Sequence, residues 1–240
     1  MLLSACPAVA TAQEAAEQPD HPVSIGELIR AIPGDFKSLP SKETGLWIGL
    51  GGAGSLAVHP ADVSITDSLS ENEALGDVLS AGDFLGSGWV QAGGAALTYG
   101  IGLATASPKL SRVGAELIRG QVVSSTLTLG IKVAVQRTRP DGGKYAFPSG
   151  HATAAFTSAT VLQQELGWKA GIPAYIVAGY VGIARVQGRH HYPSDVIFGA
   201  FVGIASARTV TVRVRRTRLQ MTASALPHGI YVGFVVAPRD

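Results

Sequence analysis

The stretch FPSGHATAAFTSATVLQQEL, residues 147–166, joins a proline-containing turn to a run of small and apolar residues. Ser149 is of a residue type that often caps a helix, and Gly150 lets the backbone come close to a ligand. We therefore expect a helix over His151–Leu166 whose first amide groups and dipole can hold a phosphate. His151 then stands in its first turn, beside whatever the amides bind. A capped helix with an incidental histidine would have the same sequence.

Stretches of the same character recur along the chain and predict an all-α protein. Each is sparsely charged and rich in Gly and Ala, and proline or glycine separates one from the next. We expect a helical bundle of about six core helices, preceded by a short helix around Val23–Arg30. The core helices are expected at Gly45–Val58, Phe84–Ser107, Val113–Gln136, His151–Leu166, Gly171–Val186 and Pro193–Arg208.

The C-terminal part of the chain has a different pattern. Polar and apolar residues alternate over Thr209–Arg215, and a second apolar run covers Gly229–Val236. Both are typical of short β-strands, which can pair as a hairpin. The expected organisation is a signal-like or disordered N-terminus at 1–18, a linker with a short helix at 19–44, a helical domain at 45–210, and a C-terminal extension at 211–240, with a β-hairpin as an option.

Composition excludes some classes of protein and partner. Hydrophobic residues make up 46% of the 240-residue chain and charged residues 15%. A formal net charge of +2 is too small to indicate a nucleic-acid partner. The lone cysteine, Cys6, has no second cysteine for an internal disulfide, so the fold depends on packing.

The first residues resemble a processing signal. Ala10-Thr11-Ala12 before Gln13 matches the small-x-small pattern of a signal peptidase site, and Leu3–Cys6 resembles a bacterial lipoprotein box. The basic residues that normally begin such signals are absent, so a disordered Ala-rich tail is the alternative. We expect an extracytoplasmic location, the bacterial periplasm.

Membrane association is a further expectation. A membrane span needs roughly 20 mostly apolar residues, and only Phe84–Pro108 stays uncharged that long. Acidic residues gather in His59–Asp83, whereas basic residues fall in loops expected on the opposite side, as in a positive-inside arrangement. We expect a compact bundle at the membrane surface. The alternative is an integral membrane protein with a periplasm-facing site.

Two cations lie upstream of residues 147–166. Lys132 and Arg139 are about two helical turns apart, so they share a helix face, and Pro140 ends that helix beside Arg139. Such a pair fits an anion site, but it is also common on a solvated surface.

A third polar segment runs from Arg185 to Asp195. Pro193 suits the first position of a helix, which places Asp195 in the first turn, close to His191. A carboxylate there can accept a hydrogen bond from one ring nitrogen and leave the other free to attack. A solvated polar loop is the alternative. A zinc site at His190 and His191 is disfavoured, because adjacent residues seldom converge on one ion and Cys6 is remote.

Together the three segments resemble the signature of the type 2 phosphatidic acid phosphatase and vanadium haloperoxidase family, in its bacterial lipid or acid phosphatase branch. The signature has Lys with Arg-Pro seven residues on, then Pro-Ser-Gly-His, then Ser-Arg with His and Asp at set distances. The matching positions are Lys132, Arg139, Pro140, Pro148 to His151, Arg185, His191 and Asp195. Ala184 stands where the family usually has Ser. The resemblance covers about Gly45 to Arg208.

The resemblance implies a division of labour. His191 would attack phosphorus and form a phosphohistidine, with Asp195 orienting it. His151 would protonate the leaving alcohol and then activate water. The residues that would bind the phosphoryl group are Lys132, Arg139, Ser149, Gly150 and Arg185. The resemblance implies no metal or other cofactor, and vanadate would fit the phosphate site.

The expected activity is therefore hydrolysis of a phosphomonoester or diphosphate. The apolar helices and the export signal favour a phosphorylated lipid over a small soluble ester. A vanadate-dependent haloperoxidase would use the same residues, and a non-catalytic envelope or membrane protein is the alternative from another class. Arg189, His190 and Tyr192 are expected to form the pocket wall, and Lys144 to add to the field around the phosphate.

Overall fold

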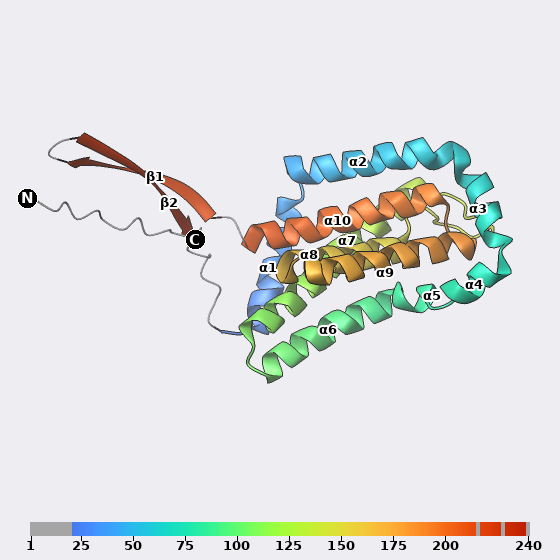
Figure 1. Cartoon of the computed structure of the whole chain (residues 1–240), viewed down its shortest axis with the longest axis horizontal. Helices are drawn as coiled ribbons and strands as arrows, with labels where there is room; N and C mark the ends of the chain where they lie inside the picture. Colours follow the sequence, from blue (N-terminus) through green and yellow to red (C-terminus); the bar gives the residue numbers. More distant parts are fainter. Residues whose placement is uncertain (1–20, 215–216, 227–228, 239–240) are drawn as a thin grey trace, which may run out of the picture. The chain divides into compact units, whose positions relative to one another are not determined.

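The computed structural model describes residues 21–214, 217–226 and 229–238. It separates into a helical unit, His21–Val214, and a second unit that contains a hairpin (Figure 1). The helices are α1 (Ile25–Ser38), α2 (Lys42–Val58), the 3-10 turn η1 (His59–Ala61), α3 (Asp62–Ser70), α4 (Glu73–Leu79), α5 (Gly82–Leu85), α6 (Gly88–Ala104), α7 (Pro108–Val135), α8 (Gly150–Leu166), α9 (Trp168–Gln187) and α10 (Pro193–Val214); the strands are β1 (Thr217–Leu226) and β2 (Gly229–Pro238).

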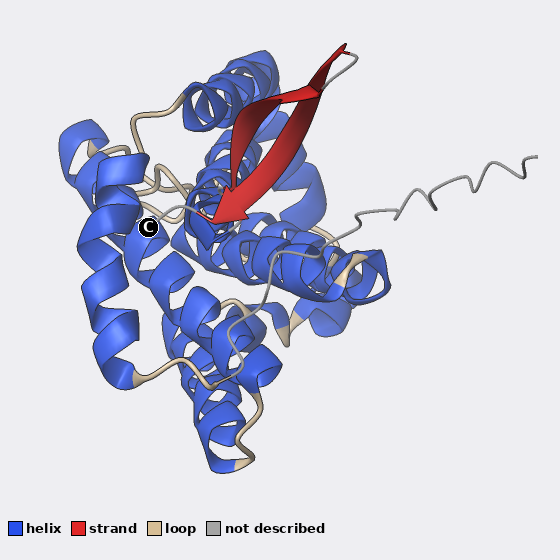
Figure 2. Cartoon of the chain, turned by 90° about the vertical axis from the view of Figure 1, so that its left-hand side faces the viewer, coloured by secondary structure: helices blue, strands red, loops and turns tan. Residues whose placement is uncertain are grey.

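The all-α prediction is confirmed for the helical unit, where every regular element is a helix (Figure 2). The core helices expected from the sequence correspond to α2, α6, α7, α8, α9 and α10. The helix predicted at Phe84–Ser107 is too long, because α6 covers only Gly88–Ala104. The chain breaks between α5 and α6 because Ser87 takes an extended conformation and its hydroxyl accepts the amide of Val90 as an N-cap.

The acidic segment between α2 and α6 is helical rather than an open connection. It forms α3, α4 and α5. Asn72 begins α4, since its side-chain oxygen accepts the amide of Leu75. This segment supplies Asp62 and Asp83, which contact the site described below.

The prediction of a strand at Thr209–Arg215 is wrong for residues 209–214, which form the last part of α10. The hydroxyls of Thr209 and Thr211 donate to the carbonyls of Ala205 and Ala207, one turn earlier. Val210 is fully buried in the bundle, so packing overrides the alternating pattern. The hairpin lies further along: β1 pairs antiparallel with β2, with Thr217 opposite Pro238 and Leu226 opposite Gly229.

Helix α8 lies at the centre of the helical unit, where it packs against α7, α9 and α10. Helix α6 covers α7, and α2 lies along α10 (Figure 1). The core between these helices consists mainly of small residues, such as Ala155, Ala159 and Ala178, with Val161 and Val181 between them. Small side chains let the helices approach closely, which suits the Gly- and Ala-rich sequence.

The backbones of α8 and α10 touch at two glycines. A Cβ atom on Gly199 would lie 2.6 Å from the carbonyl oxygen of Ser149, and one on Gly203 would lie 2.4 Å from that of Thr153. Both distances are too short for any side chain. The contact therefore fixes the start of α8 against α10.

A buried ion pair joins α1 to α7. The guanidinium of Arg119 donates through Nε to Asp35 at 2.8 Å and through Nη2 at 2.5 Å, and Asp35 is fully buried. A second buried pair, Arg112 with Glu165 at 3.0 Å, joins α7 to α8. Paired charges of this kind are costly to leave single.

Large apolar side chains are exposed on several helices. They include Leu56 on α2, Trp89 on α6 and Trp168 on α9. Over the described part of the chain, every helix is too short or too polar to traverse a bilayer.

The α8–α10 contact yields a stability prediction. Gly203→Ala should lower the free energy of unfolding by about 1–3 kcal/mol, because the new methyl group overpacks the interface. Gly94→Ala is the matched control: that glycine lies in α6 with nothing within 4 Å of an added Cβ, and alanine favours a helix. Chemical denaturation of both variants tests this. Equal stabilities would contradict the close backbone contact.

Candidate active site

The three motif segments converge at the start of α8. Lys132 lies in the last turn of α7, and a Cβ atom on Gly150 would lie 3.9 Å from its Cε atom. The charges of Lys132 and Arg185 both act on the ring of His191, and His191 and Arg185 act on that of His151. Arg139 acts on Lys132 in the same way. Residues up to 59 positions apart thus form one cluster of cations and histidines.

Ser149 shapes the N-terminus of α8. It is fully buried, and its hydroxyl accepts the amide of Ala152 at 3.5 Å as the N-cap. Its own amide donates to the carbonyl of Asp195 at 3.0 Å, so this amide is already used. The amides of Gly150 and His151, which begin the helix, have no intrahelical acceptor. They are the ones placed to bind an anion.

His191 lies almost completely buried in the loop before α10. Its Nδ1 atom is 3.8 Å from Oδ2 of Asp195, which is longer than a hydrogen bond. Burial lowers the pKa of His191, and Asp195 only partly opposes this. The ring is therefore neutral at neutral pH, with Nε2 on the side away from the carboxylate.

Asp195 takes its hydrogen bonds from other groups. Oδ1 accepts from Arg137 at 2.6 Å, and Oδ2 accepts the amide of Tyr192 at 2.8 Å. The expected hydrogen bond from His191 is therefore replaced by an electrostatic contact. Sequence reasoning missed Arg137, although it lies between the two cations of the first motif.

The three cations of the cluster are Lys132, Arg139 and Arg185, and each is placed by its neighbours with N–H groups left to donate. Lys132 donates to the carbonyl of Tyr145 at 2.5 Å, and burial, with the charge of Arg139, lowers its pKa to about 8. The Nε atoms of Arg139 and Arg185 are buried and find no acceptor among the described residues. Arg185 also forms an ion pair with Asp83 of α5. Each cation can thus donate to a phosphoryl oxygen.

His151 stands half-buried in the first turn of α8. Burial, followed by the positive charge of Arg185, lowers its pKa to about 4. The negative charge of Asp83 opposes this, and a bound phosphate would act in the same direction. His151 can therefore accept a proton when an anion binds.

The three residues expected in the pocket wall, Arg189, His190 and Tyr192, have different surroundings. His190 lies between Asp83, at 3.6 Å, and Asp141, at 3.1 Å, on the rim of the site. Arg189 pairs with Asp67 of α3, and the ring of Tyr192 lies 4.4 Å from the Arg137 guanidinium. Lys144 is exposed. The described residues contain no group of three or more His, Cys, Asp or Glu side chains arranged to hold a metal.

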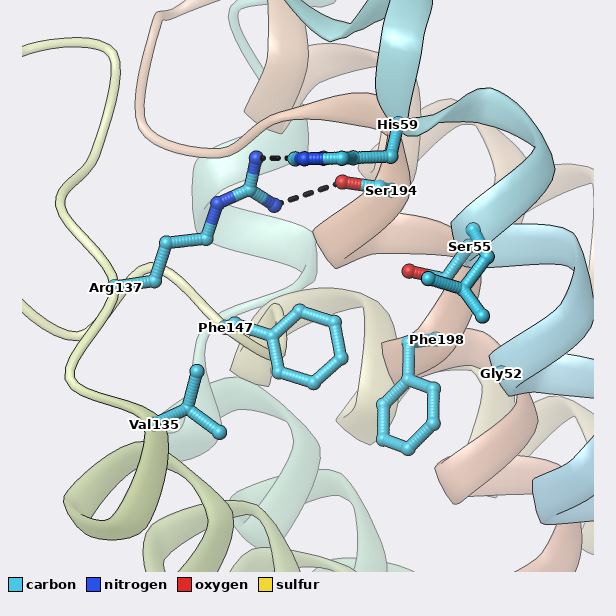
Figure 3. Close-up of a pocket in the computed structure, with 9 residues that line it drawn as sticks. Gly52, Ser55, His59, Val135, Arg137, Phe147, Ser194 and Phe198 are labelled. Atoms are coloured by element: carbon cyan, nitrogen blue, oxygen red, sulfur yellow. Dashed lines mark hydrogen bonds between the residues drawn. The ribbon is translucent and has the colours of Figure 1, made fainter.

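A cavity of about 300 Å³ adjoins the site between α2, α10 and the loop that follows α7 (Figure 3). One wall carries Arg137, His59 and Ser194. The other is apolar and includes the rings of Phe147 and Phe198, whose centroids are 4.7 Å apart. Phe147 belongs to the loop that precedes α8, so the apolar wall lies close to the start of that helix.

A model of the PAP2 superfamily matches residues 115–219. Lipid A 1-phosphatase of Porphyromonas gingivalis is 36% identical over 96 residues, which is 38% of this chain and 20% of that protein. Lipid A 4'-phosphatase of Helicobacter pylori is 28% identical over 115 residues, 43% of this chain and 58% of that protein. The matches thus span a fifth and somewhat over half of these relatives.

Two crystal structures share the fold. That of Aquifex aeolicus LpxE covers 63% of this chain and 95% of its own, with a TM-score of 0.54 and 21% identity. That of the first transmembrane PAP2 type phosphatidylglycerolphosphate phosphatase, from Bacillus subtilis, covers 78% and 94%, with a TM-score of 0.56 and 19% identity.

The lowered pKa of His151 can be tested directly. In the free protein its ring should titrate near pH 4, and saturating phosphate should move the midpoint upward, because the added negative charge favours the imidazolium. NMR titration of the ring, assigned with a His151→Gln variant, measures both midpoints. A midpoint near the ordinary histidine value without phosphate would contradict the geometry.

Proposed function

We propose that this chain is a phosphatase of the PAP2 superfamily, whose model matches residues 115–219, and that it hydrolyses phosphorylated lipids through a phosphohistidine intermediate. The observation that carries this proposal is the convergence of three cations and two histidines on the first turn of α8. Donors fixed in a partly desolvated site stabilise the charge that builds up on a phosphoryl group. The cluster therefore supports phosphoryl transfer.

In the first step, Nε2 of the neutral His191 attacks phosphorus as the bond to the leaving oxygen breaks. His151, protonated in the presence of the bound phosphate, donates its proton to that oxygen and the alcohol departs. The imidazole that bears the phosphoryl group carries positive charge, which the nearby carboxylate of Asp195 stabilises. Lys132, Arg139 and Arg185 neutralise the phosphoryl oxygens throughout.

In the second step, the neutral His151 takes a proton from water. The resulting hydroxide attacks phosphorus and breaks the bond to His191, which regains its lone pair. His151 is protonated again and ready for the next turnover.

A lipid substrate is proposed from the surroundings of the site. The two relatives are named as lipid A phosphatases, and one solved structure as a phosphatidylglycerolphosphate phosphatase. The apolar wall around Phe147 and Phe198 and the exposed Leu56, Trp89 and Trp168 support a substrate with acyl chains. We also propose that the protein works at a membrane surface outside the cytoplasm, which the signal-like first residues support.

Substitution of the nucleophile tests the activity. His191→Ala should reduce the kcat of phosphate release by at least about 1000-fold, because the covalent step needs the ring nitrogen. The control is His190→Ala, which removes the neighbouring histidine on the rim and should keep most of the activity. Phosphate release is measured from lipid A, phosphatidylglycerolphosphate, phosphatidic acid and a soluble aryl phosphate, with EDTA present.

Persistent activity of His191→Ala would contradict the mechanism. Bromide oxidation by peroxide that appears only after vanadate is added would favour a haloperoxidase instead. A preference for the soluble ester would contradict the lipid substrate while leaving the chemistry intact.

The pH dependence of phosphate inhibition tests the role of Lys132. Because the pKa of Lys132 is about 8, its charge is present below that pH and is lost above it. Inorganic phosphate should therefore inhibit less strongly as the pH rises through 8. Lys132→Met should bind phosphate more weakly at pH 7 and lack this further decline. Inhibition constants between pH 6 and 9.5 provide the measurement, and parallel curves for both proteins would exclude Lys132 as the titrating group.

A further inference from the structure

Arg137 holds two buried carboxylates from distant parts of the chain. It lies in the loop after α7, and its Nη1 atom donates to Oδ1 of Asp195 at 2.6 Å. Its Nη2 atom donates to Oδ2 of Asp62, the first residue of α3, at 2.7 Å. Figure 3 shows the guanidinium directed toward His59 and Ser194. One fork thus bridges α3 and α10.

Ser194 completes the bridge. Its hydroxyl accepts from Nη1 of Arg137 at 2.8 Å and donates to Asp62 at 2.5 Å, and its amide donates to the other oxygen of Asp62 at 2.9 Å. The ring of Tyr192 lies under the guanidinium. Arg137 is therefore fixed by groups on both sides of Asp195, in the segment that also contains His191.

Both carboxylates need this cation. Asp195 is fully buried and Asp62 nearly so. Burial raises the pKa of Asp62, but the hydrogen bonds from Arg137 and Ser194 more than offset it, so the pKa lies below its ordinary value. A buried carboxylate without a partner is strongly disfavoured.

His191 does not supply the charge that Asp195 requires. Its ring is neutral before the reaction and lies at 3.8 Å. Lys132 acts on Asp195 only at longer range. Among the described residues, Arg137 is the one cation with a hydrogen bond to the Asp195 side chain.

We propose that Arg137 is a positioning residue of the phosphoryl transfer, which holds the Asp195 carboxylate in place beside His191 until that ring becomes positively charged. The proposal rests on the proposed function, since it assigns a task within that reaction. Arg137 touches no reacting atom and acts through Asp195. Its guanidinium reaches Asp195 and Asp62 at once, which the single ammonium of a lysine cannot reproduce.

A structural tie between α3 and α10 is the competing explanation, and two variants separate the two roles. Asp62→Asn removes the ionic half of the tie at α3 but leaves Arg137 bound to Asp195. Arg137→Ala removes both contacts. A tie alone predicts that the two variants lose activity together, whereas positioning predicts a selective effect of Arg137→Ala.

The experiment measures kcat and KM for phosphate release, with the folded fraction of each variant taken from thermal unfolding. Arg137→Ala should lower kcat by about 100-fold, as expected for a displaced catalytic group, and change KM little. Arg137→Lys should recover part of that loss. Asp62→Asn should keep most of its kcat. The double variant Arg137→Ala with Asp62→Asn, which removes one uncompensated charge, should fold better than Arg137→Ala and remain as slow.

Rapid-quench labelling of His191 locates the defect. Labelled phosphohistidine should form more slowly in Arg137→Ala than in the wild type. A wild-type kcat per folded molecule in Arg137→Ala, or an equal loss in Asp62→Asn, would overturn the proposal. If the wild-type protein releases phosphate from no substrate and forms no labelled histidine, the proposed function itself fails, and the assignment of Arg137 fails with it.

Discussion

The hydrogen bond from the amide of Ser149 to the carbonyl of Asp195 joins the second motif segment to the third. It forms because α8 and α10 meet backbone to backbone, and Gly199 leaves no side chain between them. The bond sets the first turn of α8, with its open amides and His151, beside the loop that carries His191. A composition rich in Gly and Ala is thus a condition for the site, because larger residues along this contact would separate its two halves.

Electrostatics determine the state of every group that this contact brings together. Burial, followed by repulsion from neighbouring cations, lowers the pKa of Lys132 to about 8 and that of His151 to about 4, and burial also lowers the pKa of His191. Such a cluster is stabilised by carboxylates around it. Asp83 pairs with Arg185, and Arg137 shares its charge between Asp195 and Asp62. These carboxylates therefore partly neutralise the positive charge of the cluster.

Local sequence signals predicted the long helices and the motif cluster because each signal lies within a few residues. Ser149 is a strong cap, Pro193 begins α10, and the motif spacings agree with a known family. The helix end predicted at Pro140 is wrong: α7 ends at Val135, where Gln136 takes a left-handed conformation, so Arg139 lies in the following loop and not on a helix face with Lys132. The acidic helices α3 to α5 were missed because their apolar faces are short. The partners Arg137–Asp62 are 75 residues apart, and nothing in either segment predicts their contact. The distance between His191 and Asp195 likewise depends on what else binds the carboxylate, which spacing alone does not determine.

The ion pair between Asp83 and Arg185 affects the binding of any anion that contacts this arginine. Such an anion takes part in an exchange, in which one carboxylate leaves as one phosphoryl oxygen arrives, so the net gain is the difference between two ion pairs. Monovalent anions of weak basicity gain little from that exchange, whereas a dianion that also reaches Lys132 and Arg139 gains more. Asp83 is half exposed and lies on the short helix α5, so the displaced carboxylate can turn to water without unfolding the core. An anion that binds Arg185 therefore competes with a counterion that the chain itself carries.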